Sequence, residues 1–84
     1  MINNKVILIT GGTGSFGKKF IDVILNKFNP KRIVIYSRDE QKQFQLQEKW
    51  KGKKYSIIRF FIGDVRDFDR LKLAMQGVDI VIHA

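Results

Sequence analysis

Four largely apolar runs, of which only the third is interrupted, by Arg59, alternate with three polar-faced segments along the chain. The apolar runs cover residues 6–9, 33–36, 57–62 and 80–82. Such runs are typical of parallel strands that are buried on both faces, and the longer segments between them are typical of amphipathic helices. The order β-α-β-α-β-α-β predicts an α/β fold in which right-handed crossovers place helices on both faces of a parallel sheet. We therefore predict the N-terminal half of a doubly wound Rossmann fold, with about four strands in the order 3-2-1-4.

The first helix has the clearest pattern of the three. An apolar residue recurs every four positions at Phe16, Phe20, Ile24 and Phe28, with Ile21 and Leu25 beside this series, and the opposite side is rich in lysine. This stripe predicts the face that packs on the sheet. Asn29-Pro30 is expected to end the helix.

The two later helices are predicted mainly from their end signals. Ser37 and Glu40 are spaced as a capping box that opens a helix running to about Trp50, with a thin apolar face. Asp67 is expected to cap a short third helix that stops at Gly77. The apolar side of that helix is expected to comprise Phe68, Leu71 and Met75.

A glycine-rich segment directly follows the first predicted strand and opens the first helix. Residues 10–17 read TGGTGSFG, which contains both G-x-x-G-x-x-G and G-x-G-x-x-G. Glycines here allow a tight turn and the close approach of a pyrophosphate, whose charge is stabilised by the free N–H groups of the helix N-terminus. In this context the motif predicts a dinucleotide site that includes Gly11, Gly14 and Gly17.

The end of the second strand predicts which dinucleotide binds. NAD sites place a carboxylate about 20 residues after the glycine motif, whereas this chain has Ser37 there, followed by Arg38. A hydroxyl donor and a guanidinium suit a 2′-phosphate, and Lys42 lies one helical turn further on. We therefore predict NADP over NAD. The alternative is that Ser37 only caps a helix and that both cations are solvated.

Two further strand ends contribute candidate contacts. Asp64 can accept the adenine amino group and a backbone N–H beside it can meet a ring nitrogen, although Asp64 could instead cap a turn. At the end of the fourth strand, the backbone of Ala84 is expected to touch the nicotinamide-side ribose. His83 is interpreted as a packed strand-end residue.

Composition narrows the class of protein. The 84 residues carry 16 Lys and Arg against 8 Asp and Glu, for a net charge of +8. The excess is local, because residues 42–59 hold six bases and one acid. Without a nucleic-acid reading motif we interpret this run as a solvated turn and expect no nucleic-acid partner. With no cysteine and one histidine we expect no metal site, and without a long apolar run we expect a cytoplasmic protein with no membrane contact.

The chain closely resembles the CapD-type polysaccharide biosynthesis proteins, a branch of the extended short-chain dehydrogenase/reductases that includes inverting UDP-N-acetylglucosamine 4,6-dehydratases. The resemblance lies in ILITGGTGSFGK, IVIYSRDE, RFFIGDVRD and RLKLAMQGVDIVIHA. It implies that NADP accepts hydride from the sugar C4 and returns it to C6 after water is lost. The site residues that it implies are Thr13, Gly14, Ser15 and Phe16 for the phosphates, Ser37, Arg38 and Lys42 for the 2′-phosphate, and Asp64 and Val65 for adenine.

The same resemblance implies that the catalytic residues of the family lie outside this chain. The family's Tyr-x-x-x-Lys pair is absent, because Glu40 follows Tyr36 and Arg59 follows Tyr55 at that spacing. We therefore expect residues 1–84 to be the N-terminal part of a longer, homo-oligomeric enzyme whose remainder binds the nucleotide sugar, and expect no catalytic residue or turnover in this part. The alternatives are a related epimerase, a non-catalytic NADP sensor and, least favoured, a basic nucleic-acid-binding domain.

Overall fold

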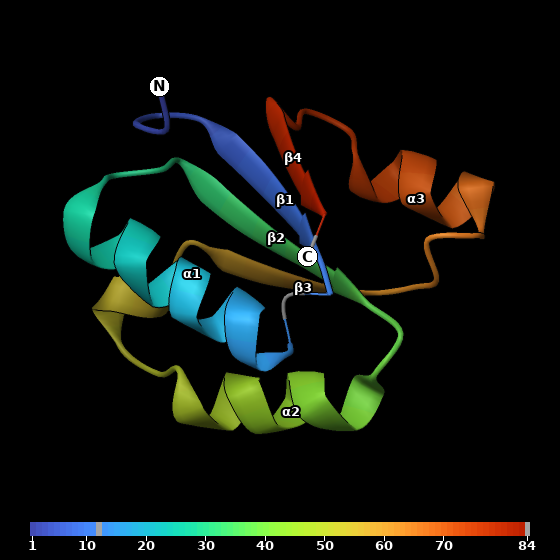
Figure 1. Ribbon diagram of the computed structural model, residues 1–84, viewed down its shortest axis with the longest axis horizontal. Helices are drawn as coiled ribbons and strands as arrows, with labels where there is room; N and C mark the ends of the chain where they lie inside the picture. Colours follow the sequence, from blue (N-terminus) through green and yellow to red (C-terminus); the bar gives the residue numbers. More distant parts are fainter. Residues whose placement is uncertain (12, 84) are drawn as a thin grey trace.

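The computed structural model describes residues 1–11 and 13–83. It contains one parallel sheet in the order β3-β2-β1-β4, as the sequence predicted (Figure 1). The strands are β1 (Val6–Thr10), β2 (Arg32–Ser37), β3 (Ile58–Ile62) and β4 (Ile80–His83). Because β4 pairs with β1 on the side away from β2, the order of the strands reverses between β1 and β4, which is where doubly wound folds bind ligands.

Three α-helices and one 3₁₀ turn connect the strands. They are α1 (Ser15–Lys27), α2 (Glu40–Lys49), η1 (Lys53–Tyr55) and α3 (Phe68–Ala74). The lysine-rich segment around η1 is exposed, as expected for a solvated connection, and it is anchored by Tyr55, whose ring stacks on Trp50 at 5.6 Å. None of the α-helices in the described parts of the chain is long and apolar enough to cross a membrane.

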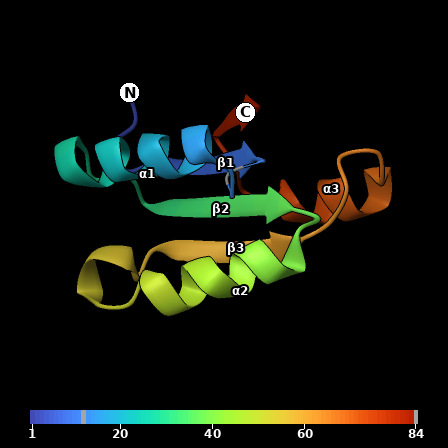
Figure 2. The ribbon, with the colours of Figure 1, turned by 60° about the horizontal axis from the view of Figure 1, so that its bottom comes forward.

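The two faces of the sheet carry separate apolar clusters. Alternate side chains of a strand point to opposite faces, so Ile7 and Ile9 pack with α1 and α2 while Val6 and Leu8 pack towards α3. The first cluster is closed by Leu46 and Trp50. All three helices thus lie where the predicted crossovers put them, with α1 and α2 on one face and α3 on the other (Figure 2).

The predicted apolar stripe of α1 is confirmed in its middle, at Phe20 and Ile24, and is wrong at its two ends. The buried face consists of Gly17, Ile21 and Ile24, whereas Phe16 is 64% exposed and Phe28 is 40% exposed. A spacing of four residues exceeds one helical turn of 3.6, so such a series drifts by about 40° per step around the helix. Its two ends therefore turn away from the sheet, and in the first turn of the helix the buried position is Gly17.

Two predictions about the later helices also need correction. Ser37 does not cap α2: it is the last residue of β2, and the cap is Asp39, whose carboxylate accepts from the Lys42 N–H at 3.0 Å. In α3, Phe68 is 81% exposed and Met75 is 41% exposed, while Ala74 is buried. This helix has only seven residues, so one short stretch meets the sheet and its first turn lies outside the core.

Candidate functional site

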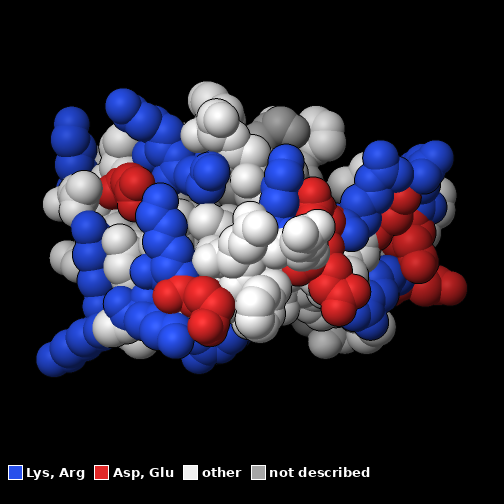
Figure 3. Space-filling view, turned by 90° about the horizontal axis from the view of Figure 1, so that it is seen from below, with Lys and Arg blue, Asp and Glu red and all other residues white. Residues whose placement is uncertain are grey.

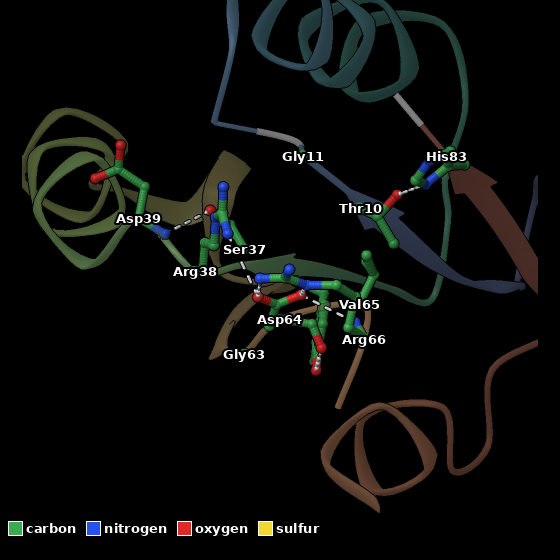
Figure 4. A pocket seen from close by; sticks show the side chains of 11 residues that line it. Thr10, Gly11, Ser37, Arg38, Asp39, Gly63, Asp64, Val65, Arg66 and His83 are labelled. Carbon is green, nitrogen blue, oxygen red and sulfur yellow. Dashed lines mark hydrogen bonds and ion pairs between the residues drawn. The ribbon is translucent and has the colours of Figure 1, made fainter. Parts of the chain in front are cut away.

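An open hollow of about 460 Å³ lies where the strands end (Figure 4). Parallel strands bring their carboxyl ends to one edge, and Figure 2 shows the arrowheads of β1, β2 and β3 together there. The hollow has the size of a small-molecule site. Its lining residues from the sequence prediction are Gly11, Ser37, Arg38, Asp64 and Val65, and it is completed by Thr10, Tyr36, Asp39, Gly63, Arg66 and His83.

The glycine turn forms one wall of the hollow. Gly11 has a φ of +70°, a left-handed conformation that favours glycine, and its N–H donates to the Tyr36 carbonyl oxygen at 3.1 Å. Gly14 stands at the N-cap position of α1, where it offers no side chain to cover the first N–H groups of the helix. Among the residues that the structure describes, an added Cβ at Gly14 would meet only the Gly11 carbonyl oxygen, at 3.7 Å. The packing of the protein therefore does not require glycine at position 14, whereas a bound pyrophosphate would.

The end of β2 lies beside this turn and lines the next part of the hollow. The Ser37 hydroxyl lies 3.4 Å from the Thr13 hydroxyl and accepts from the Asp39 N–H at 3.0 Å, and both hydroxyl-bearing residues are buried. Because the Asp39 N–H donates to Ser37, the Ser37 hydroxyl can donate its own proton either to the Thr13 hydroxyl or to a ligand. The Asp39 carboxylate is engaged by α2, with Lys42 Nζ at 4.0 Å and the Lys42 N–H as partners.

The remaining predicted contacts lie around rather than inside the hollow. Thr13 and Lys42 line a smaller neighbouring depression between α1 and α2, together with Lys18 and Lys49. Ser15 and Phe16 are exposed at the start of α1. Gly17 is buried within α1, and Ala84 lies outside the described residues.

A carboxylate between two arginines forms the floor on the β3 side. Asp64 binds Arg66 through two side-chain contacts, Nη2 to Oδ2 at 2.8 Å and Nε to Oδ1 at 3.1 Å, and accepts the Arg66 N–H at 2.9 Å. Arg38 reaches the same carboxylate at 3.4 Å. The hydrogen bonds from Arg66 hold the pKa of Asp64 well below its ordinary value, so the group is charged at neutral pH. Asp64 does accept from a turn N–H, as the alternative interpretation held, but it also faces the hollow.

Tyr36 holds the backbone at Asp64 in place. The sequence pattern predicted only that this residue belongs to a strand. Its hydroxyl donates to the Asp64 carbonyl oxygen at 2.8 Å, and burial raises the pKa of Tyr36, which keeps that proton in place. A Cβ at Gly63 would approach the Tyr36 hydroxyl oxygen to within 2.4 Å. The ring therefore dictates glycine at position 63, and the IGDV turn can bend over it.

Gln43 was also missed by sequence reasoning. Its amide nitrogen donates to the carbonyl oxygens of Ser37 at 3.0 Å and Phe61 at 3.2 Å, so it joins the ends of β2 and β3. The side chain is only 1% exposed. A glutamine on a polar helix gives no sign of such a role, although the thin apolar face of the helix was a hint that a polar side chain is buried there.

His83 is exposed, contrary to its interpretation as a packed residue. Its Nδ1 forms a hydrogen bond with the Thr10 hydroxyl across the neighbouring ends of β4 and β1. This places an imidazole at the point where the strand order reverses, on the rim of the hollow (Figure 4). The contact helps to hold the two strand ends together.

Known proteins share this sequence and geometry. The chain is 55% identical, over its full length, to a UDP-N-acetylglucosamine 4,6-dehydratase (inverting) of Campylobacter jejuni, and covers 24% of that protein. It is 44% identical to a UDP-glucose 4-epimerase of Rickettsia bellii and covers 25% of it. The X-ray structure of Pen from Bacillus thuringiensis matches the whole chain with a TM-score of 0.91 and 39% identity, again over 25% of that chain.

The chain thus spans about a quarter of the length of these relatives. Its resemblance to one family is nonetheless continuous, since the family described as polysaccharide biosynthesis protein matches residues 7–84. That range contains β2, β3 and β4, all of β1 except Val6, and every residue of the hollow. The chain therefore belongs to the polysaccharide biosynthesis protein family.

Proposed function

We propose that this chain is the NADP-binding part of a cytoplasmic UDP-N-acetylglucosamine 4,6-dehydratase that serves polysaccharide biosynthesis. The 55% identity to a dehydratase of that name supports the activity. The observation that carries the cofactor assignment is the end of β2. There the hollow is lined by the Ser37 hydroxyl and the Arg38 guanidinium, while the nearby Asp39 carboxylate is engaged by α2. That arrangement favours a 2′-phosphate over a free 2′-hydroxyl.

Bound NADP would supply a reversible hydride acceptor for oxidation and reduction of the sugar. The residues of this chain bind and orient the cofactor. The α1 N-terminus and Gly14 hold the pyrophosphate, Ser37, Arg38 and Lys42 hold the 2′-phosphate, and Asp64 and Val65 hold the adenine. The groups that act on the sugar belong to a longer polypeptide, so we expect no turnover by residues 1–84 alone.

The test is a titration of the chain with NADP and NAD at moderate salt, read by calorimetry and by the fluorescence of Trp50. We expect saturable binding that favours NADP. Arg38→Ala should narrow the ratio of the two affinities by about tenfold or more, because a charge-assisted hydrogen bond to the phosphate is lost. The matched control is Lys27→Ala, which removes one positive charge from the last turn of α1, at the end of the helix away from the glycine turn. It should leave the ratio of the NADP and NAD affinities unchanged.

Other outcomes identify other functions. An affinity ratio that Arg38→Ala does not change would overturn the assignment of the 2′-phosphate site. Binding of nucleic acid that falls steeply with salt and survives Arg38→Ala would instead indicate a basic nucleic-acid-binding domain, the reading that the sequence favours least.

An epimerase is the second candidate, supported by the 44% identity to a UDP-glucose 4-epimerase. The two activities leave different products, because a dehydratase removes one water molecule from the sugar and an epimerase only inverts a carbon centre. A longer polypeptide that carries this chain should be incubated with UDP-N-acetylglucosamine and with UDP-glucose, and the products weighed by mass spectrometry. Loss of water from UDP-N-acetylglucosamine supports the dehydratase, whereas a C4 epimer of unchanged mass supports the epimerase.

A further inference from the structure

The Asp64 carboxylate has no acceptor position left for a ligand. A carboxylate offers about four lone-pair positions on its two oxygens. Oδ1 accepts from the Arg66 N–H and Nε, and Oδ2 accepts from Nη2 of Arg66 and Nη1 of Arg38. The adenine amino group proposed to bind here can therefore donate to Asp64 only if one of these four donors leaves.

Arg38 is the donor that can leave most easily. Its contact with Oδ2 is 3.4 Å long, against 2.8 Å for the Arg66 contact to the same oxygen. Both side chains are exposed, at 74% for Arg38 and 78% for Arg66, so the number of contacts distinguishes them. Arg38 has this single contact with the carboxylate, whereas Arg66 is held through its side-chain fork and its own backbone N–H. Release of Arg38 thus breaks one long interaction, while release of Arg66 breaks several short ones.

We propose that Arg38 exchanges the Asp64 carboxylate for the 2′-phosphate of NADP, and that this exchange frees Asp64 Oδ2 to accept the adenine amino group. The proposal rests on the proposed cofactor function and deepens it. The 2′-phosphate draws Arg38 away because it is a stronger, doubly charged partner for a guanidinium than a carboxylate already shared with Arg66. NAD has no such group, so Arg38 stays on Asp64 and competes with the adenine amino group.

Arg66 has a distinct task in this exchange. Its fork fixes the orientation of the carboxylate while Arg38 moves, and its charge keeps Asp64 ionised after one arginine has gone. Arg66 is therefore a positioning residue, and Arg38 links recognition of the phosphate to recognition of the base. The chain discriminates between NADP and NAD through the adenine as well as through the phosphate.

The consequence is a measurable coupling between two parts of the ligand. Deamino-NADP and deamino-NAD carry oxygen in place of the adenine amino group, so each reports how much that group contributes to affinity. The loss of affinity on deamination should be larger for NADP than for NAD, by about fivefold, the change that one net hydrogen bond makes in an equilibrium. Any effect of deamination on the ring nitrogen is common to both pairs and cancels in the ratio.

The experiment measures dissociation constants of the four dinucleotides for the 84-residue chain and for two variants. In Arg38→Ala, Asp64 Oδ2 is free for either ligand, so deamination should reduce the affinity for NAD as much as the affinity for NADP. The ratio of these two losses should therefore fall from about five to about one. Lys42→Ala removes a cation that lies near the proposed 2′-phosphate position and pairs with Asp39 instead of Asp64. The preference for NADP should therefore fall, while the ratio of the two deamination losses should not change. Circular dichroism verifies that each variant is folded.

The possible outcomes distinguish failure of the Arg38 exchange from failure of the proposed NADP binding. A chain that prefers NADP but shows equal deamination costs for both dinucleotides would overturn the exchange and leave the cofactor assignment intact. A chain that does not prefer NADP would overturn both. If the deamination loss in Arg38→Ala is still about fivefold larger for NADP than for NAD, the exchange is also overturned. The dependence of adenine binding on the 2′-phosphate would then arise from residues other than Arg38.

Discussion

The two faces of the sheet differ in what their side chains support. The face under α1 and α2 buries Ile7, Ile9, Ile33 and Ile35 with side chains from both helices. The face towards α3 has a smaller buried cluster, whose largest member is Tyr36, and α3 leaves Phe68 81% exposed. The first face is a close-packed apolar core, while the second connects directly to the hollow through the Tyr36 hydroxyl.

This difference separates stability from site geometry. Apolar burial acts without direction, so the α1/α2 face can hold the sheet together but cannot place a carboxylate. On the other face one hydroxyl and one close glycine contact set the path of the chain from Gly63 to Asp64. Substitutions on the two faces should therefore have different signatures.

The largest expected effect comes from the apolar core. Ile24→Ala, at a side chain that is 1% exposed, should lower the free energy of unfolding by about 2–5 kcal/mol. Leu71→Ala, at a half-buried position on the α3 face, should cost about 1 kcal/mol, since less apolar surface is lost. Urea denaturation measures both, and equal costs would contradict the proposed difference between the faces.

Two glycines at the edge of the hollow should respond in opposite ways. Gly63→Ala forces a Cβ against the buried Tyr36 ring and should destabilise the chain by about 1–3 kcal/mol. Gly14→Ala meets no close contact within residues 1–11 and 13–83, and should change stability by less than about 1 kcal/mol. Under the proposed function it should nevertheless weaken NADP binding by obstructing the pyrophosphate. Thermal unfolding and an NADP titration of both variants test this contrast. A stable Gly14→Ala variant with undiminished affinity would show that the turn holds no phosphate.

A smaller effect is expected at the link between β2 and β3. Gln43→Met keeps the length of the side chain but removes the donors to the Ser37 and Phe61 carbonyl oxygens, which should cost about 1 kcal/mol of stability. Under the proposed function those strand ends bind the 2′-phosphate and the adenine. Affinity for adenosine 2′,5′-bisphosphate should therefore fall about fivefold, while affinity for pyrophosphate should not change.

The matched control for that variant is Gln47→Met, at an exposed glutamine one turn further along α2. It should leave both stability and affinity within error. Calorimetry with the two ligands measures the affinities, and an equal loss for both ligands in Gln43→Met would indicate a general loss of structure instead of a displaced strand end.

The smallest effect is a dependence of stability on acid. The pKa of Asp64 lies below its ordinary value of 3.8 in the folded chain, so the folded state binds fewer protons than the unfolded state near that pH. The stability that Asp64 contributes is complete above about pH 4 and is lost as the pH falls further. Asp64→Asn should flatten this acid limb of the stability curve. Asp69→Asn, at an exposed carboxylate in the first turn of α3, is the control and should leave the limb as it is.

Much of the fold followed from local patterns. Continuous apolar runs identified the strands, and the glycine motif placed the first turn correctly between β1 and α1. The sequence also brought Gly11, Ser37, Arg38, Asp64 and Val65 to one edge, because parallel strands end on the same side. These features depend on periodicity and topology, which short segments of sequence encode.

The errors arose where a residue's neighbours come from another element. Phe16 and Phe68 look apolar enough for a core, but their exposure depends on where a helix ends relative to the sheet. Ser37 has the spacing of a capping residue, yet Asp39 takes that position because β2 extends through Ser37. Helix-end signals of this kind compete over two or three residues, and the length of the preceding strand decides between them.

The sequence by itself determined the class of the fold, the order of the strands and the edge at which a dinucleotide would bind, because each depends on repeating apolar spacing and on the handedness of crossovers. Only the tertiary structure decided that Asp64 is shared between Arg38 and Arg66, that Tyr36 requires glycine at position 63 and that Gln43 joins two strand ends. Each of these contacts joins side chains by direction and distance in space. Hydrogen bonds and close contacts lose their energy over a few tenths of an ångström, a scale that no pattern of residue types specifies.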